Sequence, residues 1–151
     1  MATSQEHTHR YVEPGWFTRN VFNRTMMGFA RRGISLRGSR VLAVRGRTSG
    51  DWRTVPVNPL DFSGHRYLVA PRGQTQWVRN VRAGGATELR LGRRTETVHP
   101  IEVADRDKPE ILREYVRRWK AEVGHFFEGI DANSTDDELL AIAPGFPVFT
   151  I

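Results

Sequence analysis

The chain contains no cysteine, and lysine supplies only two of its 23 basic residues. The lack of cysteine excludes disulfide bonds and thiol chemistry. Hydrophobic runs are short, and none approaches the roughly 20 apolar residues that a membrane-spanning helix needs. The first residues also lack the apolar stretch of a secretion signal. These absences favour the cytoplasm, although attachment to a membrane surface is left open.

The composition is that of a folded protein, with 38% hydrophobic and 26% charged residues among 151. A chain of this length buries about two-thirds of the surface that it exposes when unfolded. We expect a flexible tail over residues 1–14 and a single domain over residues 15–151.

Arginine is concentrated in one part of the chain. From Arg31 to Arg94 there are 14 arginines against three acidic residues, a balance of +11, and from Glu102 to Glu138 there are 11 acidic against six basic residues, a balance of −5. A basic surface attracts nucleic acid, anionic lipid or a polyanionic small molecule. Guanidinium groups suit phosphate and carboxylate because they bind them through two parallel hydrogen bonds. A genome with a bias toward arginine explains much of this surplus equally well.

The order of predicted elements indicates an α+β, mainly β protein. Pro56 and Pro59 restrict the second strand to an edge or a bend. Thr75, Asp107 and Thr135 are the expected helix N-caps. Antiparallel strands with peripheral helices favour a small barrel of about six strands over a parallel sheet. Hydrophobic spacing predicts helices over 16–32, 75–82, 108–127 and 135–143, and strands over 41–45, 53–62, 67–70, 88–91, 95–103 and 146–151.

The turn between the first two predicted strands carries a candidate anion site. Two glycines permit backbone angles that other residues resist, and short side chains between them leave turn amides accessible to an anion. Two arginines flank the turn and supply positive charge. An ordinary exposed hairpin with incidental arginines explains the same pattern. The residues concerned are Gly46, Arg47, Thr48, Ser49, Gly50 and Arg53.

A second candidate segment, APRGQTQWVRN, follows the third predicted strand. Arg72 and Gly73 precede Thr75, which starts a short helix, and anions are favoured near helix N-termini. Trp77 and Asn80 are three residues apart and so share a helical face. An indole can line a planar ring and an asparagine can bind its edge, although core packing is the commoner role of a tryptophan taken alone. Together the two segments predict a site for a phosphorylated, ring-bearing cofactor.

Other function classes have little support. The chain has no nucleotide-binding loop and no dinucleotide fingerprint after a strand. His125 and Glu128 share a helical face, but two groups do not make a metal site. The serines lack a base and an orienting partner, which argues against a hydrolase. We expect no nucleic-acid partner, because no series of aromatic residues is interleaved with the basic ones.

The same segments resemble the deazaflavin-dependent nitroreductase family, whose members are small actinobacterial oxidoreductases. The resemblance rests on GRTSGDWRTVPV, YLVAPRG, QWVRNVRAGG, EVAD and the closing FPVFTI. It runs from about Trp16 to Ile151 and is strongest from Val41 to Val103. It implies the split β-barrel of the flavin-binding-like superfamily, with coenzyme F420 as the cofactor.

The resemblance also implies which residues bind the cofactor, and three positions depart from the family pattern. Thr48 stands where many members have a basic residue, and Pro71 replaces a small hydroxyl residue. Asn58 stands where a prototype nitroreductase carries tyrosine, so nitro reduction is not assumed. The implied cofactor-binding residues are Arg47, Thr48, Ser49, Gly50, Arg53, Pro56, Asn58, Ala70, Arg72, Gly73, Trp77 and Asn80.

The implied reaction is hydride transfer from the reduced deazaflavin to an electron-poor acceptor, such as an activated C=C bond, a quinone or a nitro compound. No side chain is identified as catalytic, and Trp16, Phe126 and Phe127 are candidates for the apolar side of the substrate site. The alternative is a protein of the same fold that binds F420, FMN, heme or a fatty acid without turnover. FMN also has a phosphate and a planar ring. Peripheral membrane contact through the helix over 16–32, and a homodimer, are left open.

Overall fold

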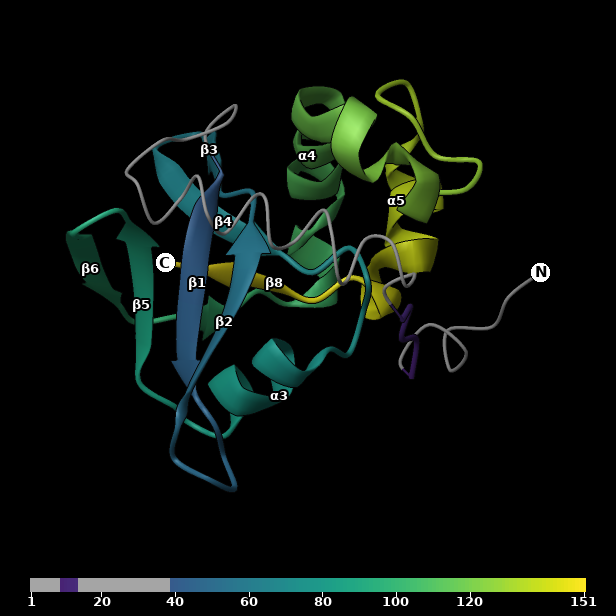
Figure 1. Cartoon of the computed structure of the whole chain (residues 1–151). Coiled ribbons are helices and arrows are strands. Elements are labelled where there is room, and N and C mark those ends of the chain that lie inside the picture. Colours follow the sequence, from purple (N-terminus) through teal and green to yellow (C-terminus); the bar gives the residue numbers. More distant parts are fainter. Residues whose placement is uncertain (1–8, 14–38) are drawn as a thin grey trace. The chain divides into compact units, whose positions relative to one another are not determined.

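The computed structural model describes residues 9–13 and 39–151 (Figure 1). The described residues divide into two compact units. Unit 1 contains 9–12, Leu60–Thr75 and Ile101–Ile151, and unit 2 contains residue 13, 39–59 and Gln76–Pro100. The helix predicted over 16–32 lies outside the described residues.

Unit 2 is built on a four-stranded antiparallel sheet in the order β2-β1-β5-β6 (Figure 1). Leu42 of β1 pairs with Val55 on one side and with Leu89 on the other. Leu42 and Val44 are two residues apart, so they share one face of the sheet, and both are fully buried. Helix α3 (Gln76–Arg82) lies beside β1. The strands are β1 (Arg40–Arg45), β2 (Trp52–Val57), β5 (Thr87–Leu91) and β6 (Arg94–Val98).

Two glycines end α3. Gly84 has a φ of 84°, a conformation that residues with a Cβ rarely adopt. Its amide donates to the carbonyl of Val81 at 2.9 Å, and the Gly85 amide donates to the carbonyl of Asn80 at 3.0 Å. This pair of bonds is the Schellman motif, which satisfies carbonyls that the helix end leaves open.

Unit 1 contains the second four-stranded antiparallel sheet, in the order β3-β4-β8-β7. β3 and β4 form a hairpin with the two-residue loop Ser63–Gly64. Both loop residues have positive φ, 52° and 78°, as a type I′ turn requires. The strands are β3 (Leu60–Phe62), β4 (His65–Val69), β7 (Ile101–Glu102) and β8 (Val148–Thr150).

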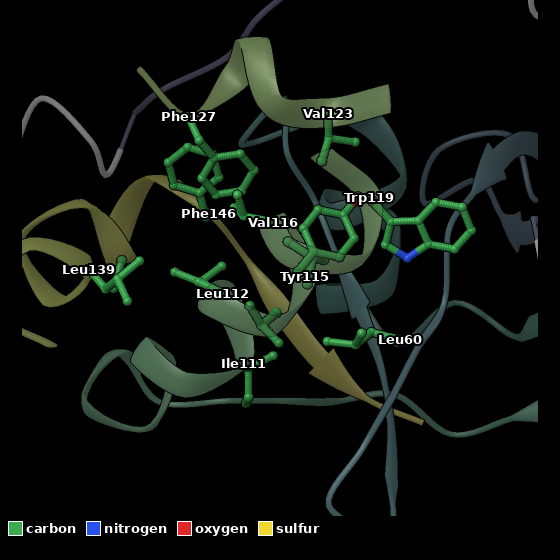
Figure 2. Packing of buried hydrophobic residues seen from close by; sticks show 13 residues of the cluster. Leu60, Ile111, Leu112, Tyr115, Val116, Trp119, Val123, Phe127, Leu139 and Phe146 are labelled. Atoms are coloured by element: carbon green, nitrogen blue, oxygen red, sulfur yellow. The ribbon is translucent and has the colours of Figure 1, made fainter. Parts of the chain in front are cut away.

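Helices α4 (Pro109–Val123) and α5 (Asp136–Ile142) pack together and cover the main core of unit 1 (Figure 2). Tyr115 and Trp119 of α4 are 1% exposed. α4 leaves helical geometry at Trp119, where φ is −118° and ψ is 22°. Short 3-10 turns are η2 (Asp105–Asp107), η3 (Gly124–Phe126) and η4 (Ala143–Gly145). Within the described ranges no helix is long and apolar enough to span a bilayer.

The three predicted helix caps had different outcomes. Thr135 is confirmed, because its hydroxyl accepts a hydrogen bond from the Glu138 amide at 3.2 Å. The prediction of Asp107 as a cap is wrong by one residue, because Asp107 belongs to η2 and Lys108 is the N-cap of α4. Thr75 directly precedes α3, but its buried hydroxyl has no hydrogen-bond partner, so it does not cap through its side chain.

The described residues form eight strands rather than about six, because two predicted strands are each divided. The segment 53–62 gives β2 and β3, and the segment 95–103 gives β6 and β7, with each half in a different sheet. Both divisions fall at a proline, Pro59 and Pro100, which has no amide to continue a ladder. The edge position predicted for the second strand is confirmed, because β2 lies at an edge. The observed class is α+β with two antiparallel sheets.

Candidate functional site

The β1–β2 turn of unit 2 is closed by its own hydrogen bonds. The Gly46 amide donates to the Asp51 carbonyl at 2.8 Å, and the Gly50 amide donates to the Gly46 carbonyl at 2.9 Å. The Ser49 hydroxyl accepts from the Asp51 amide at 3.1 Å. Gly50 has a φ of 74°, which explains the need for glycine at this position. The turn therefore keeps its shape without help from a ligand.

The outer edge of this turn offers two unpaired amides. The backbone N–H groups of Thr48 and Ser49 make no hydrogen bond to any described residue, and both residues are exposed. Adjacent turn amides of this kind form a small positive concavity that suits an anion. Arg53, on β2, is exposed and has no ion pair within the described ranges. The turn thus presents hydrogen-bond donors and an uncompensated positive charge.

Arg47 is held in place by α3. Its backbone amide and its Nη1 atom both donate to Oδ1 of Asn80, at 3.1 and 2.8 Å. Nη1 also donates to Oε1 of Gln76 at 2.9 Å. Because Asn80 is only 3% exposed, this contact anchors an exposed arginine to the interior of unit 2. The sequence predicted that Asn80 faces a ligand, but it did not predict this pairing.

Arg45 supports the turn from the end of β1, a contact that was not predicted from the sequence. Its Nη1 atom donates to the Gly50 carbonyl at 3.0 Å. Its guanidinium lies 4.2 Å from the ring centre of Trp52, and the guanidinium of Arg90 lies 4.9 Å from the same ring. Arg45 and Trp52 are directly opposite each other across β1 and β2. A sequence-based prediction of this contact would have required the register of the β1–β2 hairpin, which places Arg45 opposite Trp52.

The other predicted residues of unit 2 are less open. Trp77 is 9% exposed, so the structure places it in the core, and its role beside a planar ring remains a prediction. Pro56 is half-buried within edge strand β2, and Asn58 is half-buried just after it.

The loop after β4 carries the predicted residues of unit 1. The Ala70 amide donates to the Pro147 carbonyl at 2.8 Å, and the Gly73 amide donates to the Ala70 carbonyl at 3.1 Å. Gly73 is buried and has a φ of 85°. Arg72 is half-buried, and its Nε atom donates to the carbonyl of Val12 at 2.7 Å. Residues 10–12, which the sequence analysis assigned to a flexible tail, cross this loop, and we call them the N-terminal strap.

The structure brings together the predicted residues within each unit. Arg47 and Asn80 are in direct contact in unit 2, while Ala70, Arg72 and Gly73 share one loop in unit 1. That both groups serve a single cofactor remains a prediction from the sequence.

The candidates for the substrate side have different surroundings. Phe127 is 2% exposed and stacks on Phe146 with ring centres 4.3 Å apart, as a core residue does (Figure 2). Phe126 is half-buried beside the same core. Trp16 lies outside the described residues. Among residues 9–13 and 39–151, no group of three or more His, Cys, Asp or Glu side chains could hold a metal ion.

Several solved structures resemble this chain. One is described as a domain-swapped dimer, with 17% identity and a TM-score of 0.51 over 89% of this chain and 96% of that one. A protein of unknown function from Agrobacterium tumefaciens has 16% identity and a TM-score of 0.56, over 93% of this chain and 57% of that one. An F420-H2 dependent reductase, FDR-A, has 19% identity and a TM-score of 0.48, over 76% of this chain and 93% of that one. None of the curated proteins compared matches the chain.

The match that defines the class is to a protein family. The model of the F420H(2)-dependent quinone reductase family matches residues 16–132, which is more than half of the 151 residues. The chain belongs to this family. It is therefore an oxidoreductase of the F420-dependent kind, and its cofactor is coenzyme F420. The resemblance that the sequence suggested is confirmed.

Proposed function

We propose that this chain transfers a hydride from reduced coenzyme F420 to a quinone or a similarly electron-poor acceptor. Membership of the family identifies the cofactor and the class of reaction. The β1–β2 turn supplies the site that supports the proposal. The proposal also includes the split β-barrel fold that the sequence resemblance implies.

The observation that carries the proposal is the donor set of the turn. The amides of Thr48 and Ser49 in the turn are open, and Arg53, which follows the turn on β2, has no ion pair within the described part of the chain. This donor set fits a phosphate group, since phosphate oxygens in proteins accept hydrogen bonds from backbone amides and guanidinium groups. Thr48 contributes an amide where a basic side chain is common in the family, so the turn depends more on its two arginines.

The bound coenzyme supplies the hydride, and the protein supplies binding and orientation. Arg47, fixed by Asn80, keeps its guanidinium in one position before an anion arrives. A donor that is already ordered loses less conformational freedom on binding. We assign no side chain of the described residues to proton transfer, for which solvent suffices.

We choose the acceptor to test from the name of the family, which is a quinone reductase, and not from the nitro compounds that the prototype nitroreductase reduces. Asn58 offers no aromatic ring at the position where that prototype carries tyrosine. We therefore propose quinones as the first acceptors to examine, and activated C=C compounds as the second. A nitro compound serves as the comparison.

Oxidation of reduced F420 by a naphthoquinone, followed by absorbance, tests this proposal. We expect turnover that depends on the quinone, and a higher KM for F420 in Arg53→Met with little change in kcat, because a phosphate contact is made equally in the ground and transition states. Binding of F420 without turnover across quinones, enones and nitro compounds would instead identify a carrier of the cofactor.

A further inference from the structure

The N-terminal strap, residues 10–12, is joined to the loop after β4 by an isolated antiparallel β-bridge. Tyr11 forms an isolated β-bridge with Gly73. The Val12 amide donates to the Arg72 carbonyl at 2.8 Å, and the Gln74 amide donates to the Arg10 carbonyl at 2.7 Å. All of these residues belong to unit 1. One bridge and two backbone hydrogen bonds therefore tie the loop that carries Arg72 to a segment about 60 positions earlier.

The side chain of Arg10 fastens the strap to unit 1. Its Nη1 atom donates to the carbonyls of Pro71 at 2.6 Å and Gly145 at 3.3 Å, and its Nη2 atom donates to the carbonyl of Phe126 at 3.3 Å. The guanidinium also lies 4.2 Å from the ring centre of Phe146. Burial lowers the pKa of the Arg10 guanidinium, but arginine stays charged in proteins. One cation thus holds three separate backbone segments.

The strap in turn holds the side chain of Arg72. The Arg72 Nε atom donates to the Val12 carbonyl at 2.7 Å, and its Nη2 atom donates to the Tyr11 hydroxyl at 3.4 Å. The guanidinium lies 5.7 Å from the centre of the Tyr11 ring. A free arginine side chain loses up to about 2 kcal/mol of rotamer entropy when it is ordered. The strap imposes this order before any ligand binds.

Gly73 shows that the loop is matched to the strap. A Cβ atom at this position would lie 2.1 Å from the carbonyl oxygen of Arg10, which is backbone, and the φ of 85° disfavours any other residue as well. The close approach of strap and loop therefore depends on glycine here.

We propose that the strap is part of the cofactor site, and that Arg10 is a positioning residue that fixes the Arg72 guanidinium for an anionic group of the cofactor. The group is a phosphate or a glutamate carboxylate, which arginine binds in the same way. This inference rests on the proposed function, because it takes Arg72 as a contact of the cofactor. It adds residues 10–12, which lie before the segment that the family model matches.

A double-mutant cycle on Arg10 and Arg72, read as the Kd for F420 from fluorescence titration, tests the proposal. We expect Arg10→Met and Arg72→Met each to raise the Kd about tenfold, as for the loss of a charged hydrogen bond. The double variant should bind no more weakly than Arg72→Met alone, because Arg10 acts through Arg72. Arg106→Met, an exposed arginine of unit 1, is the matched control and should bind as the unaltered protein does.

One further variant and one further ligand complete the test. Tyr11→Leu removes the ring beside Arg72 at a position that is 44% exposed, so we expect a higher Kd with an unchanged Tm of the cofactor-free protein, even if Arg10→Met fails to fold. Titration with F420 that lacks its glutamate tail separates the two anions. The effect of Arg10→Met persists if the phosphate is bound and disappears if the tail is bound.

The inference is overturned if Arg10→Met and Tyr11→Leu bind F420 normally while Arg72→Met binds it weakly. It is also overturned if the effects of Arg10→Met and Arg72→Met simply add, because Arg10 then acts on the fold and not through Arg72. In both cases the proposed function stands. If the unaltered protein does not bind F420, the proposed function itself fails.

Discussion

Asn80 is the residue that connects the interior of unit 2 to the candidate anion site. Its Oδ1 atom accepts from both the amide and the guanidinium of Arg47. Because both donors belong to one residue, a single amide oxygen fixes the backbone and the side chain of Arg47 together. The spacing of Trp77 and Asn80 predicted the helical face on which Asn80 lies, but not the partner that it binds there.

Replacement of Asn80 is predicted to affect both stability and binding. Asn80→Ala removes the acceptor of two hydrogen bonds and should lower the free energy of unfolding by about 1–3 kcal/mol in urea denaturation. It should also raise the Kd for F420, because Arg47 becomes free to rotate.

Gln76→Ala is the control, because Gln76 is exposed and makes one of the Arg47 contacts without being buried. We expect it to change stability by less than about 0.5 kcal/mol. An Asn80→Ala variant as stable as the unaltered protein would contradict the anchoring role of Asn80.

Arg10 shows what sequence reasoning cannot reach at the scale of single residues. Its partners Pro71, Phe126 and Gly145 are 61 to 135 positions away, and no local pattern encodes contacts at that distance. Arg47, Arg53 and the turn glycines were accessible from the sequence, because a turn is determined by a few neighbouring residues.

At the scale of elements, the end of α3 and the end of β1 are packed backbone to backbone. A Cβ on Gly85 would lie 2.7 Å from the carbonyl oxygen of Arg45 and 3.0 Å from that of Asn80. A Cβ on Gly84 would meet nothing within 4 Å, although its φ is 84°. The two neighbouring glycines are therefore required for different reasons.

This difference gives a prediction that separates stability from binding. Gly84→Ala should cost about 1–2 kcal/mol of stability, through its left-handed conformation alone, and leave the Kd for F420 unchanged. Gly85→Ala should cost about 1–3 kcal/mol, through overpacking, and also raise the Kd, because it displaces Asn80 and Arg45 from the turn. Urea denaturation and F420 titration of both variants provide the measurement. Equal Kd values for the two variants would refute the link between this packing and the turn.

The sequence predicted the position of most described elements, but not the division of two strands. In the segments 53–62 and 95–103 the apolar pattern runs through Pro59 and Pro100, so each reads as one strand. A strand ends where its hydrogen bonds to the neighbouring strand end. The apolar pattern of a segment does not show which strand that neighbour is. The hairpin loops, the ends of α3 and the cap at Thr135 were predictable, because each depends on residues within one turn of the chain.

At the scale of the whole molecule, charge is the property that bears most on function. The formal net charge is +6, and the basic residues are concentrated before residue 95. Such a distribution attracts an anionic cofactor from a distance and raises its association rate.

The association rate of F420 should therefore depend on ionic strength. Stopped-flow fluorescence should show a rate that falls by about tenfold or more between low salt and 0.5 M salt, since the Debye length shrinks from roughly 30 Å to below 8 Å over that range. A deazaflavin that lacks both phosphate and glutamate is the control, and its association rate should change little. A rate for F420 that does not depend on salt would show that this charge has no steering role.

If the β1–β2 turn binds the phosphate of F420, removal of the Arg53 guanidinium must weaken binding, so the decisive measurement is the Kd of Arg53→Met for F420. Arg93→Met is the matched control, because Arg93 is also exposed and lies in the β5–β6 turn of the same unit. We expect a Kd for F420 about tenfold higher in Arg53→Met and unchanged in Arg93→Met. If Arg53→Met binds F420 as tightly as the unaltered protein, the turn does not bind the phosphate through Arg53.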